Sequence, residues 1–266
     1  MKLFIFPNTS NERYIDASVR GIRLLEEKCG AFCVLSAEHS ELLFGNTDRA
    51  CGTPDECDLV VSIGGDGCAL KAAQVAVQYD KPLVGVNSGR LGYLCALDIC
   101  ALDSADESVF DHLFPAERTL LSFTLNGEHH FAVNDVVFGK EYFGETVDLA
   151  VQCNNRPLAS CRADGLIVST PTGSTSYNLS AGGPILLPDA PCFAITPICP
   201  HFSDIHPYVV PDNAELKICV AGRSERAFVY ADGNLLGDIH QHLILTQNER
   251  KLKLLVRNES TNKAAE

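Results

Sequence analysis

The sequence predicts an α/β N-terminal domain with a parallel sheet, followed by a β-rich C-terminal domain. Strand-like and helix-like segments alternate over the first hundred residues, which is typical of a parallel sheet covered by helices. From about residue 119 the helical spacing gives way to short strand-like runs separated by turn signals. The length of 266 residues and the hydrophobic content of 46% are enough for one large domain or two modest ones with a real core.

The first strand-helix-strand unit is predicted at the N-terminus. KLFIF at residues 2–6 is a short apolar run typical of a strand. Ile15, Val19 and Ile22 then recur at helical spacing up to Gly30, a residue type common just past a helix end. AFCVLS at residues 31–36 is the next predicted strand.

A second unit of the same kind follows a polar segment that is predicted to be a loop. DLVVSI at residues 58–63 is predicted to be a strand buried on both faces. CALKAAQVAVQY at 68–79 is predicted to be a helix and PLVGVN at 82–87 a further strand. Residues 98–117 are predicted to form a helix and a connection, which gives a first domain over residues 1–110.

The second domain is predicted over residues 111–245 and is expected to be antiparallel. The run TLLSFTLNGEHHFAVNDVVFG contains Asn126-Gly127, the strongest short hairpin signal. TVDLAVQCNNRPLASC repeats the pattern around Asn154-Asn155. Adjacent strands joined by such tight turns must run in opposite directions.

Composition narrows the possible partners. A net charge of −13 without a cluster of lysines and arginines argues against nucleic acid or an anionic membrane as a partner, because both require counterion replacement. Small phosphate-bearing ligands remain possible, since backbone N–H groups and Mg²⁺ can neutralise phosphate locally. The twelve cysteines include no CxxC pair, no segment reaches the ~20 apolar residues of a membrane span, and the apolar run at the N-terminus is too short for a signal peptide. We therefore expect a cytoplasmic protein with free thiols.

The stretch VVSIGGDGCALKAA, residues 60–73, places three glycines and an acid between a predicted strand and a predicted helix. A dinucleotide fingerprint is disfavoured, because Leu70 stands in place of the third glycine and Asn87 where an acid is expected. A P-loop is excluded, because Cys68 and Ala69 follow the last glycine instead of Lys and Ser or Thr.

Two interpretations of this GGDG stretch remain. Asp66 could be an ordinary capping residue in a tight turn. Alternatively, Asp66 accepts a proton from an attacking hydroxyl, while Gly65 and Gly67 let phosphate approach the backbone at a helix N-terminus. The second arrangement is the one expected of a kinase that acts on an alcohol.

A second polar stretch is RADGLIVSTPTGSTSYNLSAGGPIL, residues 162–186. It concentrates neutral hydrogen-bond donors and acceptors, which suit ribose hydroxyls and an adenine edge better than a metal or an apolar ligand. The alternative is a Ser/Thr-rich turn that only caps a helix beginning near Ser176.

Together these motifs resemble a known family. SIGGDGCALKAA, GVNSGRLGYL, AVNDVVFG, ADGLIVSTPTGSTSYNLSAGGPIL and YADGN occur in the order and approximate spacing of the NAD kinases. GGDG is shared with diacylglycerol and sphingosine kinases, whereas the long D-G-x-x-x-S-T-P-T-G-S-T-x-Y stretch is specific to NAD kinases. The resemblance covers residues 62–234.

The resemblance implies an active site in the cleft between the two domains and a C-terminal segment, residues 246–266, that returns to the first domain. It implies transfer of the γ-phosphoryl group of ATP, or of another phosphate donor, to the 2′-hydroxyl of the adenosine ribose of NAD. It also implies Mg²⁺ or another divalent cation bound through the donor phosphates rather than through protein side chains, and assembly as a homodimer or homotetramer.

Site residues follow from the matching motif positions. Asp66 matches the proposed base, with Gly65 and Gly67 at the phosphates, and Asn134 with Asp135 matches an Asn-Glu pair that contacts adenine and ribose. Asp232-Gly233 lies on a matching late loop. The remaining implied nucleotide contacts are Arg162, Asp164, Thr175, Ser176, Tyr177, Asn178, Ser180 and Asn234.

Four positions depart from the family pattern. Cys68 stands where Thr is common, Asp135 where Glu is usual, Ser176 where Ala is frequent and Asn234 where Gln is frequent. Cys68 removes a hydroxyl beside the proposed base, and Asp135 is one methylene shorter than Glu.

Two other functions stay open as alternatives. A lipid kinase could use the same GGDG loop, although an apolar entrance or a basic membrane-facing patch would then be expected. A non-catalytic NAD(P) sensor could retain the pocket, although Asp66 argues against it. Tyr93, in GRLGYL, could line the nucleotide pocket or pack under the sheet.

Overall fold

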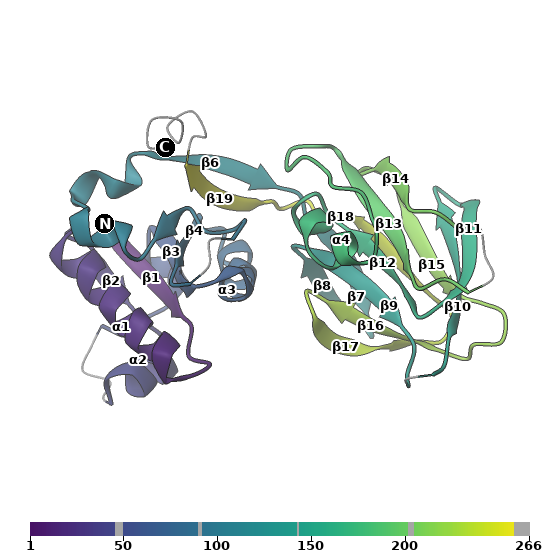
Figure 1. The fold of residues 1–266 in the computed structure, drawn as a ribbon, viewed down its shortest axis with the longest axis horizontal. Coiled ribbons are helices and arrows are strands. Elements are labelled where there is room, and N and C mark those ends of the chain that lie inside the picture. The colour runs from purple at the N-terminus through teal and green to yellow at the C-terminus, as the bar shows by residue number, and fades with distance from the viewer. Residues whose placement is uncertain (46–49, 90–91, 143, 202–204, 258–266) are drawn as a thin grey trace. The chain divides into compact units, whose positions relative to one another are not determined.

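The computed structural model describes every residue of the chain except 46–49, 90–91, 143, 202–204 and 258–266. The chain forms two compact units, the first made of Met1–Glu117 with Leu252–Glu266 and the second of Arg118–Lys251 (Figure 1). The predicted boundary after residue 110 is too early, because β6 (Leu113–Arg118) lies in the sheet of the first unit. The two-domain fold class is as predicted.

The first unit contains a seven-stranded sheet in the order β2-β1-β3-β4-β19-β6, with β5 also paired to β4. The strand pairs β1–β2, β1–β3, β3–β4 and β4–β19 are parallel, so the carboxyl ends of these strands share one edge. The strands other than β6 are β1 (Lys2–Pro7), β2 (Phe32–Val34), β3 (Leu59–Gly64), β4 (Leu83–Asn87), β5 (Leu97–Asp98) and β19 (Leu252–Arg257).

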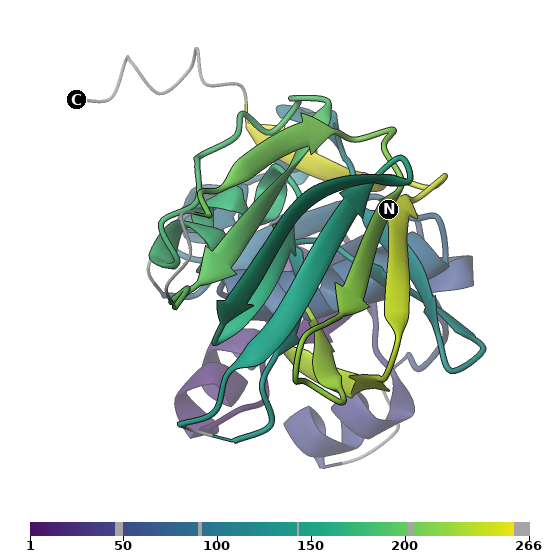
Figure 2. The same ribbon diagram turned by 90° about the vertical axis from the view of Figure 1, so that its right-hand side faces the viewer.

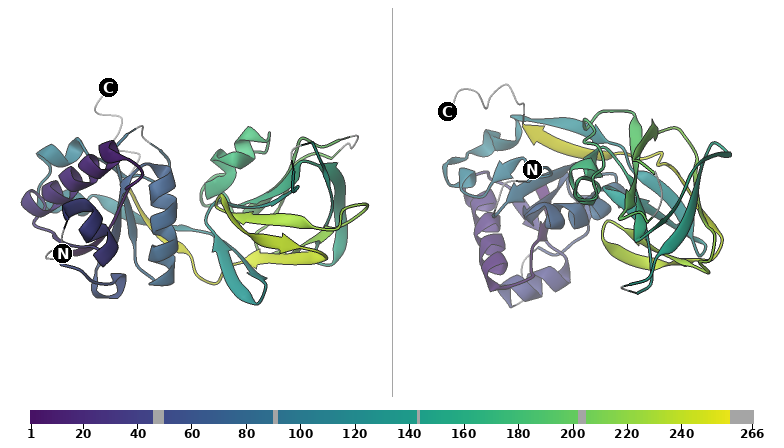
Figure 3. Two further views of the ribbon diagram at one scale, coloured as in Figure 1. Left: turned by 90° about the horizontal axis from the view of Figure 1, so that it is seen from below. Right: turned by 45° about the vertical axis from the view of Figure 1, so that its right-hand side comes forward.

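The described residues of this unit form three α-helices: α1 (Glu12–Glu27), α2 (Ala37–Phe44) and α3 (Asp66–Gln78). Ile63 and Gly64 are neighbours at the end of β3 and contact different helices. A Cβ at Gly21 of α1 would lie 3.1 Å from the Ile63 side chain, whereas a Cβ at Gly64 would lie 2.6 Å from Cys68 of α3. Since successive strand residues point to opposite faces, α1 and α3 cover opposite faces of the sheet (Figure 3).

Two segments of the first unit differ from the sequence prediction. The helix α2 lies in a stretch for which the sequence predicts no helix, and it is held by the Ser36 hydroxyl, which accepts the His39 N–H. Residues 98–117 contain two short 3₁₀ turns, η2 (Ala101–Ser104) and η3 (Glu107–Phe110), instead of a helix. Asp106 caps η3 by accepting the Ser108 N–H, which ends the preceding turn and starts a new one.

The second unit consists of two six-stranded sheets whose strand pairs are antiparallel (Figure 2). One sheet has the order β11-β10-β15-β18-β7-β8 and the other β14-β13-β12-β9-β16-β17. One hydrophobic core contains side chains from both sheets, including Phe123, Phe138, Leu149 and Phe193. The antiparallel prediction is confirmed.

The strands of the first of these sheets are β7 (Leu121–Leu125), β8 (Glu128–Ala132), β10 (Val147–Cys153), β11 (Arg156–Ala163), β15 (Leu216–Val220) and β18 (His242–Gln247). Those of the other are β9 (Asp135–Gly139), β12 (Gly165–Ser169), β13 (Cys192–Ile198), β14 (Tyr208–Pro211), β16 (Ala227–Ala231) and β17 (Asn234–Ile239). A 3₁₀ turn, η4 (Thr172–Thr175), and a short helix, α4 (Tyr177–Ser180), follow β12.

Both predicted hairpins are present. Asn126 and Gly127 have φ values of 53° and 84° between β7 and β8, and Asn154 and Asn155 have 50° and 60° between β10 and β11. Two consecutive positive φ values match the twist of the flanking strands, and Asn and Gly adopt them most readily.

The C-terminal segment predicted as residues 246–266 divides between the two units. Leu252–Arg257 forms β19 beside β4, whereas 246–251 belongs to the second unit. Residues 258–266 lie outside the described part of the chain.

Candidate functional site

The GGDG turn joins β3 to α3 at the carboxyl edge of the first sheet. Gly64 is required for packing, because a Cβ there would lie 2.6 Å from Cβ of Cys68. In contrast, a Cβ at Gly65 or Gly67 would meet nothing within 4 Å, and neither residue has a positive φ. The chain itself therefore gives no steric reason for glycine at 65 and 67, and both leave the backbone open to a ligand.

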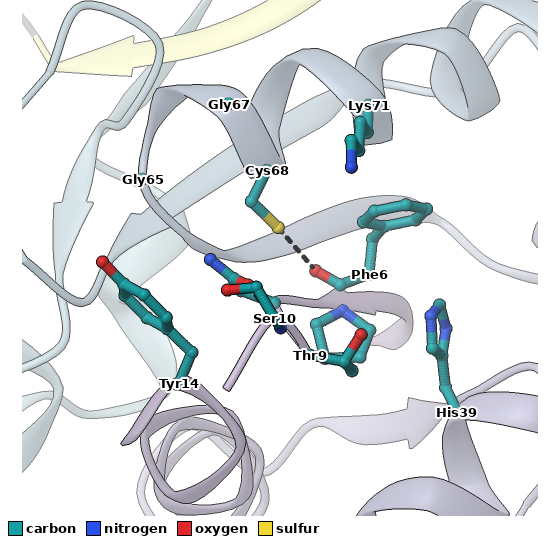
Figure 4. Close-up of a pocket in the computed structure, with 11 residues that line it drawn as sticks. Phe6, Thr9, Ser10, Tyr14, His39, Gly65, Gly67, Cys68 and Lys71 are labelled. Atoms are coloured by element: carbon teal, nitrogen blue, oxygen red, sulfur yellow. Dashed lines mark hydrogen bonds between the residues drawn. The ribbon is translucent and has the colours of Figure 1, made fainter. Parts of the chain in front are cut away.

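A pocket of about 510 Å³ lies beside this turn (Figure 4). Its wall combines Gly65, Gly67 and Lys71 with the segment that follows β1, including Thr9 and Ser10. The N-terminus of the 13-residue helix α3 lies at Gly65 and carries a partial positive charge. Helix N-H groups, hydroxyls and an ammonium group together favour an anion such as phosphate.

Cys68 lines the same pocket but faces inward. Its Sγ points to the carbonyl oxygens of Phe6 and Ile63, at 3.6 and 3.7 Å, and only 8% of the residue is exposed. Burial raises the pKa of the Cys68 thiol to about 11. The thiol is therefore neutral at physiological pH and acts as packing beneath the turn.

Asp66 holds a loop that is distant in the sequence. Its two carboxylate oxygens accept the N–H groups of Tyr93 and Leu94 at 2.8 and 3.0 Å. A Cβ at Gly92 would lie 2.2 Å from this carboxylate, so glycine is required there. Each oxygen keeps a second lone pair, which a ligand hydroxyl can use.

The capping interpretation of Asp66 is wrong. The N-cap position of α3 is Gly65, without a side-chain capping bond, and Asp66 is the first helical residue. Its hydrogen bonds go to residues 93 and 94 rather than to the first amides of α3. Tyr93 is 75% exposed, so its side chain does not pack under the sheet.

In the second unit, Asn134 and Asp135 lie where β8 bends into β9. Asp135 is only 5% exposed, and burial, followed by the charge of Asp232, raises the pKa of its carboxyl group to about 7. Asn134 is half-buried. Near neutral pH Asp135 can therefore serve as a hydrogen-bond donor or acceptor.

The hydroxyl-rich stretch packs directly on this bend. A Cβ at Gly173 would lie 2.1 Å from the carbonyl oxygen of Asn134, so glycine allows η4 to approach. Thr175 is half-buried in η4, whereas Ser176, Tyr177 and Ser180 are exposed around α4. The structure therefore joins two motifs that lie about forty residues apart.

The pKa of Tyr177 reflects the charged groups that lie near this turn. Burial raises the pKa of its hydroxyl group, and Cys199, Asp135 and Asp164 contribute through their charges. These groups are close enough to interact electrostatically, so Tyr177, Asp135 and Asp164 belong to one polar region.

Asn178 is buried, in contrast to Ser176, Tyr177 and Ser180 of the same motif. It is fully buried, its amide donates to the carbonyl oxygens of Ser174 and Pro184, and its Oδ1 accepts the Thr196 hydroxyl at 2.7 Å. We therefore correct the assignment of Asn178 from ligand contact to scaffold. It supports the turn that presents the exposed hydroxyls.

Arg162 and Asp164 are already paired within the second unit. Arg162 donates to both oxygens of Asp148 at 2.6 and 2.9 Å, which lowers the pKa of Asp148 to about 2. Lys140 lies 2.7 Å from Asp164. A ligand that uses either residue must share or displace an existing ion pair.

Asn234 is exposed at the start of β17. Its amide lies 3.5 and 3.3 Å from the carbonyl oxygens of Ala231 and Asp232. Both distances are long, so the amide can turn toward a ligand.

Sequence reasoning missed two groups. Lys71 of α3 points into the pocket (Figure 4). Its position in CALK, directly after GGDG, is the sequence feature that could have identified it. Asp232 was noted only as part of a matching loop, although its carboxylate accepts backbone N–H groups from the Asn134–Asp135 bend. No sequence signal predicts that second contact.

The described part of the chain contains neither a metal-binding cluster nor a membrane-spanning helix. No group of three or more His, Cys, Asp or Glu side chains in this part of the chain is arranged to hold a metal ion. None of the helices that the structure describes is long and apolar enough to cross a membrane.

Comparison with solved structures supports the fold. The yeast NADH kinase complexed with NADH superimposes with a TM-score of 0.82 at 20% identity, covering 97% of this chain and 84% of that one. An NAD kinase from Archaeoglobus fulgidus in complex with ATP gives a TM-score of 0.75 at 23% identity, covering 100% and 97%.

Comparison of sequences identifies the family. Residues 14–114 match the ATP-NAD kinase N-terminal domain, and residues 133–256 match the ATP-NAD kinase C-terminal domain. The NAD kinase of Bacteroides fragilis is 33% identical over 88% of this chain and 84% of its own length. That of Thiobacillus denitrificans is 36% identical over 91% and 87%. The chain therefore belongs to the NAD kinase family.

Proposed function

We propose that this chain transfers the γ-phosphoryl group of ATP to the 2′-hydroxyl of the adenosine ribose of NAD, giving NADP. The observation that carries the proposal is the GGDG turn, where Gly65 and Gly67 face open space on either side of the carboxylate-bearing Asp66. The curated relatives at 32–38% identity are named NAD kinases, which supports the same reaction.

The pocket beside the GGDG turn is the proposed donor site. The amides of the first turn of α3 and the Lys71 ammonium group would bind the phosphates, with Thr9 and Ser10 as further donors. The residues that line the pocket fit a triphosphate, because they include the Lys71 ammonium group and no carboxylate side chain. Mg²⁺ would be held through the donor phosphates, where it neutralises charge during transfer.

The polar region around α4 is the proposed acceptor site. Asn134 and Asp135 offer hydrogen bonds to adenine and ribose, and Thr175, Ser176, Tyr177 and Ser180 offer hydroxyl groups. Because its pKa is about 7, Asp135 keeps its proton about half of the time at pH 7, so it repels the nucleotide phosphates less than a fully ionised buried carboxylate would.

Asp66 is the proposed base. The proton of the ribose 2′-hydroxyl passes to an Asp66 oxygen as the ribose oxygen bonds to the γ-phosphorus. The bond from that phosphorus to the bridging oxygen breaks, and ADP leaves. Alignment and electrostatics supply most of the rate, and proton acceptance adds about 10² to 10⁴-fold.

Assembly as a homodimer or homotetramer and a cytoplasmic location are part of the proposal. The twelve free cysteines support a reducing compartment, since thiols of this number would pair in an oxidising one. Light scattering at micromolar concentration tests the assembly, and a monomer would contradict it.

The test of the proposed function is phosphorylation by the purified protein. NAD, ATP and Mg²⁺ should give NADP, detected with an NADP-specific dehydrogenase, with equimolar ADP. Sphingosine and diacylglycerol are the comparison acceptors. Phosphorylation of a lipid without phosphorylation of NAD would favour the lipid kinase, and NAD binding without turnover would favour the sensor.

A further inference from the structure

The turn between β16 and β17 places one carboxylate against three consecutive backbone amides. Oδ2 of Asp232 accepts the N–H of Val133 at 2.9 Å, and Oδ1 accepts those of Asn134 and Asp135 at 2.7 and 3.3 Å. The N–H of Asp232 in turn donates to the carbonyl oxygen of Asp135 at 3.0 Å. Residues almost a hundred positions apart are thus joined by four hydrogen bonds.

The carbonyl side of the same bend is also satisfied. The Thr170 hydroxyl donates to the carbonyl oxygen of Val133 at 2.6 Å, and the Thr170 N–H donates to that of Asn134 at 2.9 Å. Every backbone N–H and C=O of residues 133–135 therefore has a partner. Since each bond fixes one peptide plane, the bend has little freedom to rotate.

The geometry explains why the residue at 232 is an aspartate. Three donors converge on one side chain, and only a carboxylate offers two acceptor oxygens with about four lone-pair sites. Hydrogen bonds to a charged acceptor are also roughly twice as strong as neutral ones. The backbone of Asp232 has a φ of 49°, which Asp tolerates better than most residues.

The fixed bend leaves its side chains for another partner. No side-chain hydrogen bond joins Asn134 or Asp135 to any residue that the structure describes. Asp135 nevertheless lies in the interior, at 5% exposure. The half-buried amide of Asn134 and the carboxyl group of Asp135 therefore keep their hydrogen-bonding capacity for a ligand, next to an exposed hydroxyl cluster.

We propose that Asp232 is a positioning residue, which fixes the bend so that Asn134 and Asp135 face the acceptor nucleotide. The inference rests on the proposed function, because it takes NAD as the ligand of that bend. We assign Asp232 no contact with the reacting atoms. Its carboxylate is used by the three amides.

The charge of Asp232 also affects the pKa of Asp135, which can be measured. It is the second cause, after burial, that raises the pKa of Asp135. Tyr177 of α4 is a further titratable side chain that interacts with Asp135, and it interacts in turn with Asp164 and Cys199. Removal of the charge at 232 should therefore lower the pKa of Asp135 while burial stays the same.

The first test uses Asp232→Asn. The asparagine keeps the size but offers one acceptor oxygen, and its NH₂ group faces a backbone N–H. We expect KM for NAD to rise about tenfold or more while KM for ATP changes less than about twofold, and the pH dependence of KM for NAD to move to lower pH. Asp238→Asn is the matched control, since Asp238 lies on the same hairpin and bonds to Arg226 instead of the bend.

A second variant separates position from charge. Thr170→Val removes the hydroxyl that holds Val133 from the carbonyl side and leaves the charge at 232 unchanged. It should raise KM for NAD with no shift of the pH profile. It also keeps the inference testable if Asp232→Asn does not fold.

Hydrogen exchange of the amides 133–135 in the ligand-free protein makes the result independent of catalysis. Exchange should accelerate in Asp232→Asn and Thr170→Val and stay unchanged in Asp238→Asn. Unchanged exchange in Asp232→Asn, or faster exchange with an unchanged KM for NAD and pH profile, would overturn the inference. If the parent protein forms no NADP while exchange behaves as expected, the proposed function fails and the fixed bend stands without its role toward NAD.

Discussion

The GGDG turn of the first unit and the Asn134–Asp135 bend of the second unit are built in the same way. In each, an aspartate carboxylate accepts backbone N–H groups from a distant segment: Asp66 from residues 93 and 94, and Asp232 from residues 133–135. A carboxylate holding several amides makes strong, directional bonds. Both regions are therefore fixed before any nucleotide binds.

The regions differ in which residue is proposed to face the ligand. At the bend, Asp232 holds the backbone, and the neighbouring Asn134 and Asp135 are the proposed nucleotide contacts. At the GGDG turn, Asp66 does both, since it holds the loop and is also the proposed base. The comparison teaches that mutating Asp66 mixes a structural effect with a chemical one, whereas the second unit keeps the two effects on separate residues.

The largest effect is expected for Asp66→Asn. It removes the proton acceptor and also turns an NH₂ donor toward the N–H of Tyr93 or Leu94. We expect kcat to fall by at least about 10²-fold, with a lower melting temperature as well. Near-normal turnover would make GGDG a purely structural turn and break the comparison.

Gly92→Ala separates the two effects at Asp66. A Cβ at residue 92 would lie 2.2 Å from the carboxylate, so the alanine should displace Asp66 while its charge stays intact. We expect kcat to fall about 10-fold or more, because misplacement of a reacting group is costly. Gly67→Ala, where a Cβ would meet nothing within 4 Å in the free protein, is the steric control for stability. Full activity of Gly92→Ala would show that the position of Asp66 does not limit the reaction.

Asp135→Asn should stabilise the protein while weakening NAD binding. Burial and the charge of Asp232 raise the pKa of Asp135 to about 7. Between about pH 4 and pH 7 the folded protein keeps a proton that the unfolded chain has released, so stability falls as pH rises through this range. Asparagine has no such loss, and we expect a gain of about 1 to 3 kcal/mol at pH 8 and little gain at pH 4.

Urea unfolding at both pH values checks this prediction. A stability gain that does not depend on pH would mean that Asp135 is not protonated in the folded protein. A loss of stability at pH 8 would mean that its carboxylate forms a favourable contact.

The smallest effect is expected for Lys71→Met in the donor pocket. Loss of the ammonium group should raise KM for ATP about tenfold and leave KM for NAD within about twofold. Lys81→Met is the matched control, because Lys81 bonds to the carbonyl oxygen of Asp55 instead of lining the pocket. Equal changes in both KM values would contradict the assignment of separate donor and acceptor sites to the two units.

Much of the fold could be predicted from the sequence where a segment repeats one period. The apolar runs at residues 2–6 and 58–63 and the helical spacing of Ile15, Val19 and Ile22 gave β1, β3 and α1. The segment 98–117 could not be predicted, because Asp106 starts its own capped turn and β6 is recruited by the sheet of the first unit. In this segment, pairing of β6 with the sheet decides the structure, and the local sequence pattern does not.

The site was predictable as motifs and unpredictable as contacts. Asp66 and the bend residues were identified from their residue types, whereas the bonds from Asp66 to residues 93 and 94 join positions 27 and 28 apart. Asn178 was assigned to the ligand because it stands in a run of hydroxyls, yet its amide fills a buried position. Burial of one polar side chain within a polar run leaves no periodic signal.

The most direct test of the central claim uses NAD and an analogue that lacks the 2′-hydroxyl on its adenosine ribose. With ATP and Mg²⁺, we expect the protein to convert NAD to NADP with equimolar ADP, and Asp66→Asn to do so at least about 10²-fold more slowly. The 2′-deoxy analogue should bind and remain unphosphorylated. Phosphoryl transfer to the deoxy analogue, or NADP formation by Asp66→Asn at the rate of the parent protein, would contradict the account.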